Sequence, residues 1–599
     1  MLEARRGRPT WERRLLARLL SHHLTAFVIP GLEVAHACGL DPEAAGLSPA
    51  ATPRHAAVLL LVGEVPPSLA HAAAVVYAQM PRPRAILAVG TDSPPPLPGA
   101  SVTVPAMQED LVAAVQQLRA VMARNAWSTE LSAFDADHAP PSDGASPGKH
   151  GAQTEANSHD MHLDRGTAGG VHGQTPPLEG VDKPHHDQAE MAAGHAMPPE
   201  PGTHQHHHHL MEEHGGHVQP QEVDHVRHEQ EMDHVAHTSA GEDPGDGHKH
   251  LHHREHEGGF MSMVMMTQDL PRSPDGLPME WLEVPFGPLF PGLPGGLALT
   301  FTLDGDTVTR ASLTQSAVAR GLAATWSGPV SGFPTRFARL DPLAGDAYRV
   351  LAVRALEAMR ATTVDRTLAW SCIGVMERQR ALSHLTWLAS FAWLLGDRWL
   401  RARAISLLQR LRGAPDVDSV ARLRPGVDRF VDRVRSMPPL RWRLQGVGGF
   451  EGADTARLRG PVARAAGGDE DARTGDPLYH DLGFTPVLRH GADAWSCLEV
   501  RLAEMRQSLD LMVAAGALSA PDLDTSMVRD GTGMATVETP RGRSTLHLTV
   551  SGGLVQTVDL DAPSTYNMEL LQTVTFQQEV SDALVGVVSL DLSPWELDR

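Results

Sequence analysis

The chain has 599 residues, of which 42% are hydrophobic and 21% charged, and its formal net charge at pH 7 is −21. This length predicts two or three domains, and the acidic balance argues against nucleic acid as a partner. The three cysteines, Cys38, Cys372 and Cys497, are too widely spaced for a disulfide framework or a cysteine-based zinc motif. No run of about 18 apolar residues occurs, so the sequence predicts no membrane-spanning segment.

The first segment, residues 1–21, is rich in arginine and leucine. Its leucines recur at helical spacing, which predicts an amphipathic helix of a cytoplasmic protein. A twin-arginine export signal is the alternative interpretation. His22 and His23 interrupt the apolar stretch that such a signal needs, so the helix is favoured.

Residues 22–125 are predicted to form an α/β domain. Residues 57–63 and 84–90 are continuous apolar runs ending in glycine, which is typical of buried strands. The other expected elements are a helix at 66–79, a short strand at 101–104 and a helix at 110–124. Strands alternating with helices in this way predict a parallel sheet.

Within this domain, residues 58–90 resemble the core of the B-type subunit of NADH-quinone oxidoreductase (respiratory complex I), which is similar to the small subunit of nickel-iron hydrogenases. The residues that carry the resemblance are Val76-Tyr77, Gln79-Met80-Pro81, Pro83-Arg84 and Gly90. In that family the domain holds a 4Fe–4S cluster on four cysteines. The resemblance therefore implies a cluster site in this part of the chain.

The four cluster positions have lost most of their ligands. The tandem cysteines of the family fall on Ala37 and Cys38, and the other two fall on Asp92 and Met107. One thiolate, one carboxylate and one thioether are a poor substitute for four thiolates. We therefore expect no intact iron–sulfur site, and we interpret Cys38 as a small packed residue.

Residues 126–258 are predicted to be a disordered linker. Its histidine-rich tract, residues 138–256, holds 24 of the 33 histidines, and no aromatic residue lies between Phe134 and Phe260. Such a segment buries too little apolar surface to offset chain entropy.

Imidazoles at three- and four-residue spacing in this tract, with interleaved acids, predict binding of Zn²⁺, Ni²⁺ or Cu²⁺. A solvated spacer and a pH-sensitive polyelectrolyte are the alternatives. The candidate ligands are His204, His206, His207, His208, His209, His225, His228, His234, His237, His248, His250, His252, His253 and His256.

Residues 259–599 are predicted to form a mostly α domain with small β elements. A hairpin is expected at 297–308 around Asp304-Gly305, and helical periodicity runs over 346–411 until Gly413-Ala414-Pro415 breaks it. Further helices are expected at 427–434 and 500–513. Strands are expected at 536–538 and 545–550, and an apolar run at 582–592 lies near the C-terminus.

Several motifs in this region, taken in order, resemble the D-type subunit of complex I, which is related to the hydrogenase large subunit. They are Phe286-Gly287-Pro288 with Pro291 and Gly295; Glu377, Arg380, Leu382, His384 and Leu385; Arg424-Pro425-Gly426-Val427; Arg501 with Glu504-Met505-Arg506-Gln507-Ser508-Leu509; Val537-Glu538-Thr539-Pro540-Arg541-Gly542; and Leu597-Asp598-Arg599.

The positions that carry chemistry in this family are changed here. A family histidine that contacts the quinone lies in a loop whose histidine positions are Phe290 and Pro294 in this chain, and the quinone-contacting tyrosine falls on Pro342. Neither phenylalanine nor proline has a side-chain donor. The nickel-binding cysteines of the hydrogenases fall on Ser593 and Glu596, which excludes nickel–thiolate chemistry.

Other polar residues of this region receive structural interpretations. His384 is interpreted as a core or interface histidine, and Cys497 as a packed thiol rather than a nucleophile. Asp493 and Arg501 are expected to form ion pairs or subunit contacts.

The resemblance as a whole implies a fusion of B-type and D-type subunits, peripheral on the cytoplasmic side of an inner membrane. Its partners would be a membrane-embedded ion- or proton-conducting subunit and other hydrophilic subunits. On residue chemistry we favour a non-redox assembly or coupling subunit with a metal-binding tract. The alternatives are an active NADH-quinone oxidoreductase-type subunit that binds quinone and NAD, and a metal-storage or chaperone protein on this scaffold.

Overall fold

The computed structural model describes residues 23–81, 83–125, 281–316, 318, 326–360, 366–519 and 523–597. These residues belong to one compact unit, formed by Met1–Pro140 together with Met266–Arg599. The predicted N-terminal helix, the histidine-rich tract and its candidate metal ligands lie outside the described residues.

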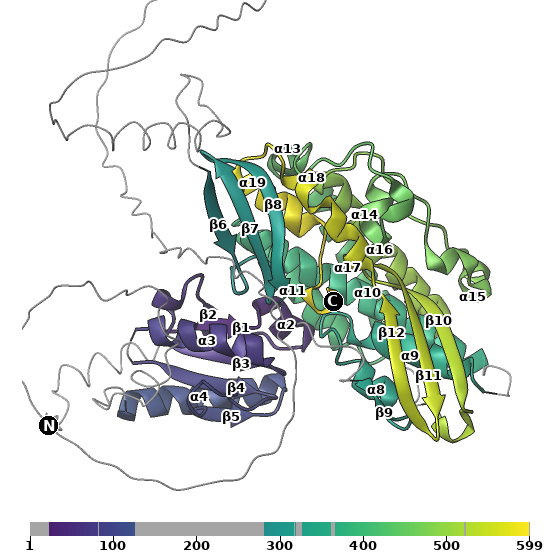
Figure 1. Ribbon diagram of the computed structural model, residues 1–599, viewed down its shortest axis with the longest axis horizontal. Coiled ribbons are helices and arrows are strands. Elements are labelled where there is room, and N and C mark those ends of the chain that lie inside the picture. The colour runs from purple at the N-terminus through teal and green to yellow at the C-terminus, as the bar shows by residue number, and fades with distance from the viewer. Residues whose placement is uncertain are drawn as a thin grey trace, which may run out of the picture. The chain divides into compact units, whose positions relative to one another are not determined.

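The N-terminal part is a five-stranded parallel sheet with the strand order β2-β1-β3-β4-β5, drawn in purple in Figure 1. Its elements are β1 (Leu24–Ile29), α2 (Leu32–Ala37), β2 (Leu47–Pro49), η1 (Pro53–His55), β3 (Val58–Val62), α3 (Pro67–Gln79), β4 (Ala85–Val89), β5 (Val102–Val104) and α4 (Gln108–Asn125). Every residue of β3 and β4 is buried, because parallel strands are covered on both faces.

The predicted parallel α/β sheet is confirmed, with strands and helices close to their expected bounds. The sequence did not predict β1, α2 or β2. Strand β1 carries Thr25 between apolar residues, and the cis-proline Pro30 and Gly31 separate it from the six-residue helix α2. Thr25 interrupts the apolar run of β1, and α2 and β2 have too few residues to display a period.

The C-terminal part is mostly helical, and two antiparallel sheets accompany its helices. The helices before residue 450 are α8 (Phe333–Phe337), α9 (Gly345–Glu357), α10 (Arg366–Leu394), α11 (Arg398–Arg412), α12 (Val417–Arg435) and α13 (Pro438–Leu444). The later helices are η2 (Thr455–Arg457), α14 (Gly460–Ala465), η3 (Ala472–Gly475), α15 (Pro477–Asp481), α16 (Ala494–Ala515), η4 (Thr525–Met527), α17 (Pro563–Asn567), η5 (Met568–Leu570), α18 (Leu571–Thr575), α19 (Val580–Ser589) and η6 (Pro594–Glu596).

One sheet has the order β6-β7-β8 and the other β10-β11-β12-β9. Their strands are β6 (Leu282–Phe286), β7 (Leu297–Asp304), β8 (Thr307–Ser316), β9 (Gly328–Pro329), β10 (Gly531–Thr539), β11 (Gly542–Ser551) and β12 (Leu554–Asp561). The predicted hairpin around Asp304-Gly305 is present as β7 and β8. Helix α9 packs on β10 and β11, as Figure 1 shows.

Helix α10 lies at the centre of the C-terminal part, in contact with α9, α11, α16 and α2. It is buried on most of its surface, and its buried side chains include Glu377, Arg380 and His384 as well as leucines. Charged side chains in so buried a helix must find partners within the protein. The helix therefore positions polar groups inside the core.

Aspartates begin three of the surrounding helices. The carboxylates of Asp397, Asp416 and Asp493 accept hydrogen bonds from backbone N–H groups in the first turns of α11, α12 and α16. Such caps satisfy donors that have no partner in the helix itself. Asp493 was expected in an ion pair or a subunit contact, so its role as a cap of α16 is a correction.

Helices α12 and α16 are longer than the sequence predicts. The expected start at 427 follows from Pro425-Gly426, but α12 begins at Val417 and continues through Pro425, which is exposed. A proline on the solvent side removes one backbone hydrogen bond, and the packing of the buried face compensates for the loss. None of the helices described in the structure combines the length and apolar character needed to cross a bilayer.

Candidate functional site

A buried ion network lies between α10, α14, α16 and β10. It contains four carboxylates (Glu377, Asp471, Glu504, Glu538) and three guanidinium groups (Arg380, Arg464, Arg473), each at most 5% exposed. Tyr479, Ser508 and His384 add hydrogen-bonding groups to it. Four negative and three positive charges nearly balance, as burial of so many ionisable groups requires.

Arg464 is the centre of this network. Its guanidinium lies 2.9 Å from Asp471, 2.7 Å from Glu504 and 2.8 Å from Glu538, and all four side chains are buried. Arg473 makes a second set of contacts, with Asp471 at 2.7 Å and with Glu377 and Glu504 at 3.4 and 3.5 Å. Burial opposes the charged form of Arg464, but the three carboxylates outweigh it and keep its pKa above the usual value.

Glu377 and Glu504 are held ionised in this network. Burial, the largest influence, acts to raise the pKa of Glu504, yet Arg464 and the hydrogen bond with His384 keep it well below 4.5. Glu377 likewise has a lowered pKa against its burial, since it faces Arg380 and Arg473 and accepts hydrogen bonds from Ser508 (2.6 Å) and Tyr479 (2.7 Å). Burial and the neighbouring Asp471 instead raise the pKa of Glu538, which favours its protonated form.

His384 is a core histidine, as predicted. Its Nε2 lies 2.9 Å from Glu504 Oε2, and both side chains are fully buried. Because Glu504 is ionised, Nε2 carries the hydrogen and donates it. Burial lowers the pKa of the imidazole, so it is neutral at pH 7. Cys497 is also buried, and burial raises the pKa of its thiol to about 11, which fits a packed thiol.

A second buried cluster surrounds Arg541, at the turn between β10 and β11. Its guanidinium lies 2.9 Å from Asp341, 3.4 Å from Asp591 and 3.8 Å from Glu596. Arg501 lies 3.7 Å from Asp591, which agrees with the ion pair expected of Arg501. Burial is the main cause of raised pKa values at Asp341 and Glu596, despite the attraction of Arg541.

The predicted nickel positions lie inside this second cluster. Ser593 donates to Asp341 at 2.8 Å, and Glu596 accepts from Tyr348 at 2.7 Å and from Ser564 at 2.5 Å. Pro342, the position of the quinone-contacting tyrosine, follows Asp341 directly in the chain. The structure thus places hydrogen-bonded hydroxyls and carboxylates at the two positions that the sequence resemblance matches to nickel-binding cysteines.

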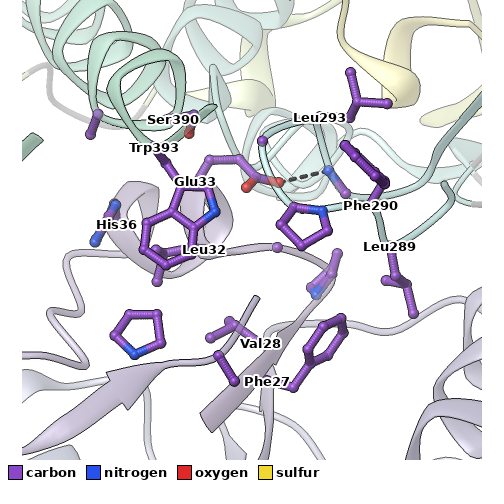
Figure 2. A pocket seen from close by; sticks show the side chains of 18 of the residues that line it. Phe27, Val28, Leu32, Glu33, His36, Leu289, Phe290, Leu293, Ser390 and Trp393 are labelled. Atoms are coloured by element: carbon purple, nitrogen blue, oxygen red, sulfur yellow. Dashed lines mark hydrogen bonds between the residues drawn. The ribbon is translucent and has the colours of Figure 1, made fainter. Parts of the chain in front are cut away.

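A cavity of about 60 Å³ lies between α2, the loop 289–295 and the end of α10 (Figure 2). Its walls are mostly apolar, including Phe27, Phe290 and Trp393, and its polar side chains include Glu33 and His36. The Glu33 carboxylate accepts a hydrogen bond from the Gly295 backbone N–H at 2.8 Å. A Cβ at Gly295 would lie 2.1 Å from the Pro30 carbonyl oxygen, so only glycine permits this approach of the two backbones.

Phe290 lines this cavity, and Pro294 lines a smaller one of about 30 Å³ on the other side of Glu33. The sequence predicted both positions as degenerate quinone contacts, and the structure brings them to one loop beside Glu33. The sequence did not predict Glu33 and His36 as cavity residues. The available signal was two ionisable residues within an otherwise apolar six-residue helix.

The four degenerate cluster positions follow different strands of the sheet. Ala37 and Cys38 end α2, which follows β1, whereas Asp92 follows β4 and Met107 follows β5. Cys38 is half-buried, Asp92 is exposed and Met107 is 60% exposed. Burial raises the pKa of the Cys38 thiol. Over the described part of the chain, no group of three or more histidine, cysteine, aspartate or glutamate side chains is arranged to hold a metal ion.

The sequence motifs contain eight of the residues in the two buried clusters but missed several others. These eight residues lie in motifs that carry the D-type resemblance: Glu377, Arg380, His384, Arg501, Glu504, Ser508, Glu538 and Arg541. Arg464, Asp471, Arg473 and Tyr479 do not. Arg464 stands in the apolar stretch Pro461-Val462-Ala463, and an arginine in such a stretch is a signal of a buried ion pair.

Comparison with known proteins points to one family for the C-terminal region. Residues 417–520 match the family model described as the 49 Kd subunit of respiratory-chain NADH dehydrogenase. The D subunit of NADH-quinone oxidoreductase from Desulfotalea psychrophila is 26% identical over 368 residues, which cover 54% of this chain and 98% of that protein. The H subunit of NAD(P)H-quinone oxidoreductase from Parasynechococcus marenigrum is 27% identical over 268 residues, or 39% of this chain and 68% of that protein.

A solved structure of the membrane-bound sulfane sulfur reductase, an archaeal respiratory membrane complex, also aligns with this chain. Its TM-score is 0.49 at 20% sequence identity, and the alignment covers 53% of this chain and 99% of the other. The similarity of the C-terminal region to the 49 Kd subunit family rests on the family model and the two relatives, not on this solved structure. The C-terminal region of this chain contains a domain of the 49 kDa, or D-type, complex I subunit family.

Proposed function

We propose that this chain is a subunit of a respiratory membrane complex of complex I type, and that it acts in assembly and coupling without carrying electrons. The observation that carries the proposal is the contrast between the buried ion network and the positions of redox ligands in the same chain. Each carboxylate of the buried ion network, including Glu377, Glu504 and Glu538 of the D-type motifs, has a partner, whereas the positions of redox ligands hold side chains that cannot replace those ligands. An ion network of this kind fixes the packing of α10, α14, α16 and β10, which a docking subunit needs.

The N-terminal α/β part is proposed to be B-type. The support is its parallel sheet together with the B-type residues around Gln79-Met80-Pro81. Its close approach to the loop 289–295, through Glu33 and Gly295, fits two subunits fused into one chain. The hydrogenase relationship belongs to the same proposal and rests on the same residues.

Exposed arginines and tryptophans on three successive helices support the membrane-complex proposal. They are Trp399 and Arg403 on α11, Arg429 and Arg433 on α12, and Trp442 on α13, which is 77% exposed; together they are named the basic surface. Trp399 contacts Phe430, with ring centroids 6.2 Å apart, and so links α11 to α12. Exposed tryptophans and arginines are enriched at protein interfaces. We therefore propose that this surface binds an acidic subunit, and that the complex holds the chain at the cytoplasmic side of an inner membrane.

A quinone-binding subunit is the second candidate. One observation favours it: the 60 Å³ cavity lies beside Phe290, and Glu33 and His36 supply polar groups that the family positions lack. Such a site would be a modified quinone pocket, with electron transfer and NAD binding as the family resemblance implies. The third candidate, metal storage, rests on the histidine-rich tract outside the described residues.

Iron and acid-labile sulfide analysis after anaerobic reconstitution separates the first two candidates. We expect no stoichiometric cluster, because the chain has three cysteines in total and only Cys38 stands at a family ligand position. The measurement is iron and sulfide per chain, with the electron paramagnetic resonance spectrum of the reduced protein. Restoring cysteines at Ala37, Asp92 and Met107 provides the matched control for reconstitution. Four irons per wild-type chain, with a reducible signal, would contradict a non-redox role.

A further inference from the structure

The two cavities on either side of Glu33 meet at that residue. Glu33, Gly292 and Ser390 line both of them. Figure 2 shows the Glu33 side chain extending from α2 toward Ser390 and Trp393 of α10, with its carboxylate directed to the loop that carries Leu293. The smaller cavity extends from Glu33 past Ser383 and Thr386 to Arg541 and Asp591. The cavities thus join the α2 side of the protein to the Arg541 cluster.

Polar atoms without partners point to water in both cavities. Ser383 Oγ and Asp591 Oδ2 are buried and line the smaller cavity, yet neither has a hydrogen-bond partner within the described residues. The contact of Asp591 Oδ2 with Arg501, at 3.7 Å, is too long for a hydrogen bond. Both ring nitrogens of His36, on the larger cavity, also lack a partner among these residues. Volumes of about 30 and 60 Å³ exceed the roughly 10–15 Å³ that one buried water needs.

The Arg541 cluster has an excess of acid. Asp341, Asp591 and Glu596 share Arg541, and Arg501 is the second nearby guanidinium. Three carboxylates against two cations leave one uncompensated negative charge in a buried site. Such a charge is costly, so the cluster is more stable with one proton bound. The cluster is therefore built to take up and release a proton.

We propose that the two cavities hold a chain of water molecules, and that Glu33 passes protons along it between the α2 cavity and the carboxylates around Arg541. In each step the Glu33 carboxyl gives its proton to a water of the smaller cavity, and that water gives a proton to the group of carboxylates around Arg541, which borders this cavity. The Glu33 carboxylate then takes a proton from the larger cavity. Only O–H bonds form and break, so no oxidant or reductant takes part.

The surroundings of Glu33 suit a proton donor. Burial raises the pKa of the Glu33 carboxyl, against the hydrogen bond from Gly295, and so favours its protonated form. The ionisable groups that face it are His36 on its own helix, and Arg541 and Asp591 across the smaller cavity. The side chains of α10 that line the two cavities are hydroxyls, indole rings and an alanine, none of them charged. The proposal deepens the proposed function, on which it rests for its place in a membrane complex, by adding a proton path within this chain.

The test is time-resolved infrared spectroscopy of the purified full-length chain after a pH jump. It follows the C=O band of protonated carboxyl groups in wild type, Glu33→Gln and Glu109→Gln. The glutamine can still accept from Gly295, and Glu109 is an exposed carboxyl on α4 that serves as the control. We expect Glu33→Gln to slow protonation of the buried carboxylates by roughly 100-fold, in the range usual for loss of one proton-transfer group. Glu109→Gln should keep the wild-type rate.

A second variant, Ser390→Val, fills the point where the cavities meet and removes no titratable group. It should slow the same step, and far-ultraviolet circular dichroism checks that each variant folds. Wild-type rates in Glu33→Gln, or no titrating buried carboxyl in wild type, would overturn the proposal. Because this experiment needs no partner subunit, its failure is distinguishable from failure of the chain to join a membrane complex.

Discussion

Replacing Arg464 with methionine is expected to destabilise the protein by about 3–5 kcal/mol, the range found when one partner is removed from a buried ion network. Arg464 contacts Asp471, Glu504 and Glu538 at once, and all of these side chains are buried. Without Arg464, the ionised carboxylates of Asp471 and Glu504 remain in the core, and among the described residues Arg473 is the one guanidinium that still contacts them both. The measurement is the shift of the urea unfolding midpoint relative to wild type.

The matched control is Arg403→Met, which removes an exposed arginine of α11 that has no ion pair within the described residues. Its expected effect is within about 0.5 kcal/mol. Adding Glu504→Gln to Arg464→Met should recover part of the lost stability, since it removes one uncompensated charge. A change of less than about 0.5 kcal/mol for Arg464→Met would show that the network contributes nothing to stability.

The same network predicts the direction of the pH dependence of stability. The pKa values of Glu377 and Glu504 lie below their usual 4.5 in the folded protein. Their contribution is therefore fully present above the unfolded-state pKa and is lost as the pH falls through the folded-state values. In Arg464→Met this acid-side loss should become smaller, because the main cause of the low Glu504 pKa is gone.

Deleting residues 138–256 is expected to abolish most uptake of Zn²⁺, Ni²⁺ or Cu²⁺ and to leave both folded parts intact. The reason is the density of imidazoles with nearby carboxylates in a tract that has no aromatic residues. Protonated imidazole cannot bind a metal, so affinity should fall as the pH drops through about 6.5. Each site should be weaker than a structural zinc finger, because the composition of the tract predicts no packed core that would position the ligands before the metal binds.

Calorimetry on the full-length and deleted proteins, each at two pH values, measures this effect. Unfolding midpoints of the two proteins provide the control that the folded parts are unchanged. Equal metal uptake by both proteins would place the metal elsewhere and leave the tract as a linker. A tract that binds metal at low pH as well as at high pH would exclude imidazole as the ligand.

The sequence predicts the fold best where packing repeats along the chain. Continuous apolar runs such as 58–62 and 85–89 identify buried parallel strands, since both faces of these strands are covered. Helix α10 is recognisable from its leucines. Strand β1 lacks a continuous apolar run because it contains Thr25, and helix α2 is too short to show a period. Helix α12 begins at the Asp416 cap and continues through Pro425.

The candidate site depends on contacts between residues far apart in the chain. The motifs identify Glu377, Glu504 and Glu538, but no spacing indicates that Arg464 joins the latter two. The same holds for Glu33, whose partner Gly295 is 262 residues away. The resemblance implies which family ligand positions carry other residues here. Only the three-dimensional arrangement shows the water-sized cavities beside Glu33 and the acidic cluster around Arg541.

Purification of the tagged chain from its native membrane is the most direct test of the central claim, that the chain is a non-redox subunit of a membrane complex. We expect a membrane-embedded ion-conducting subunit to co-purify with it in a fixed ratio. The variant Arg429→Glu/Arg433→Glu, on the basic surface of α12, should lose this partner, whereas Arg54→Glu, exposed in the N-terminal part, should retain it. Recovery of the chain alone from detergent-solubilised membranes, with both variants behaving as wild type, would contradict the account.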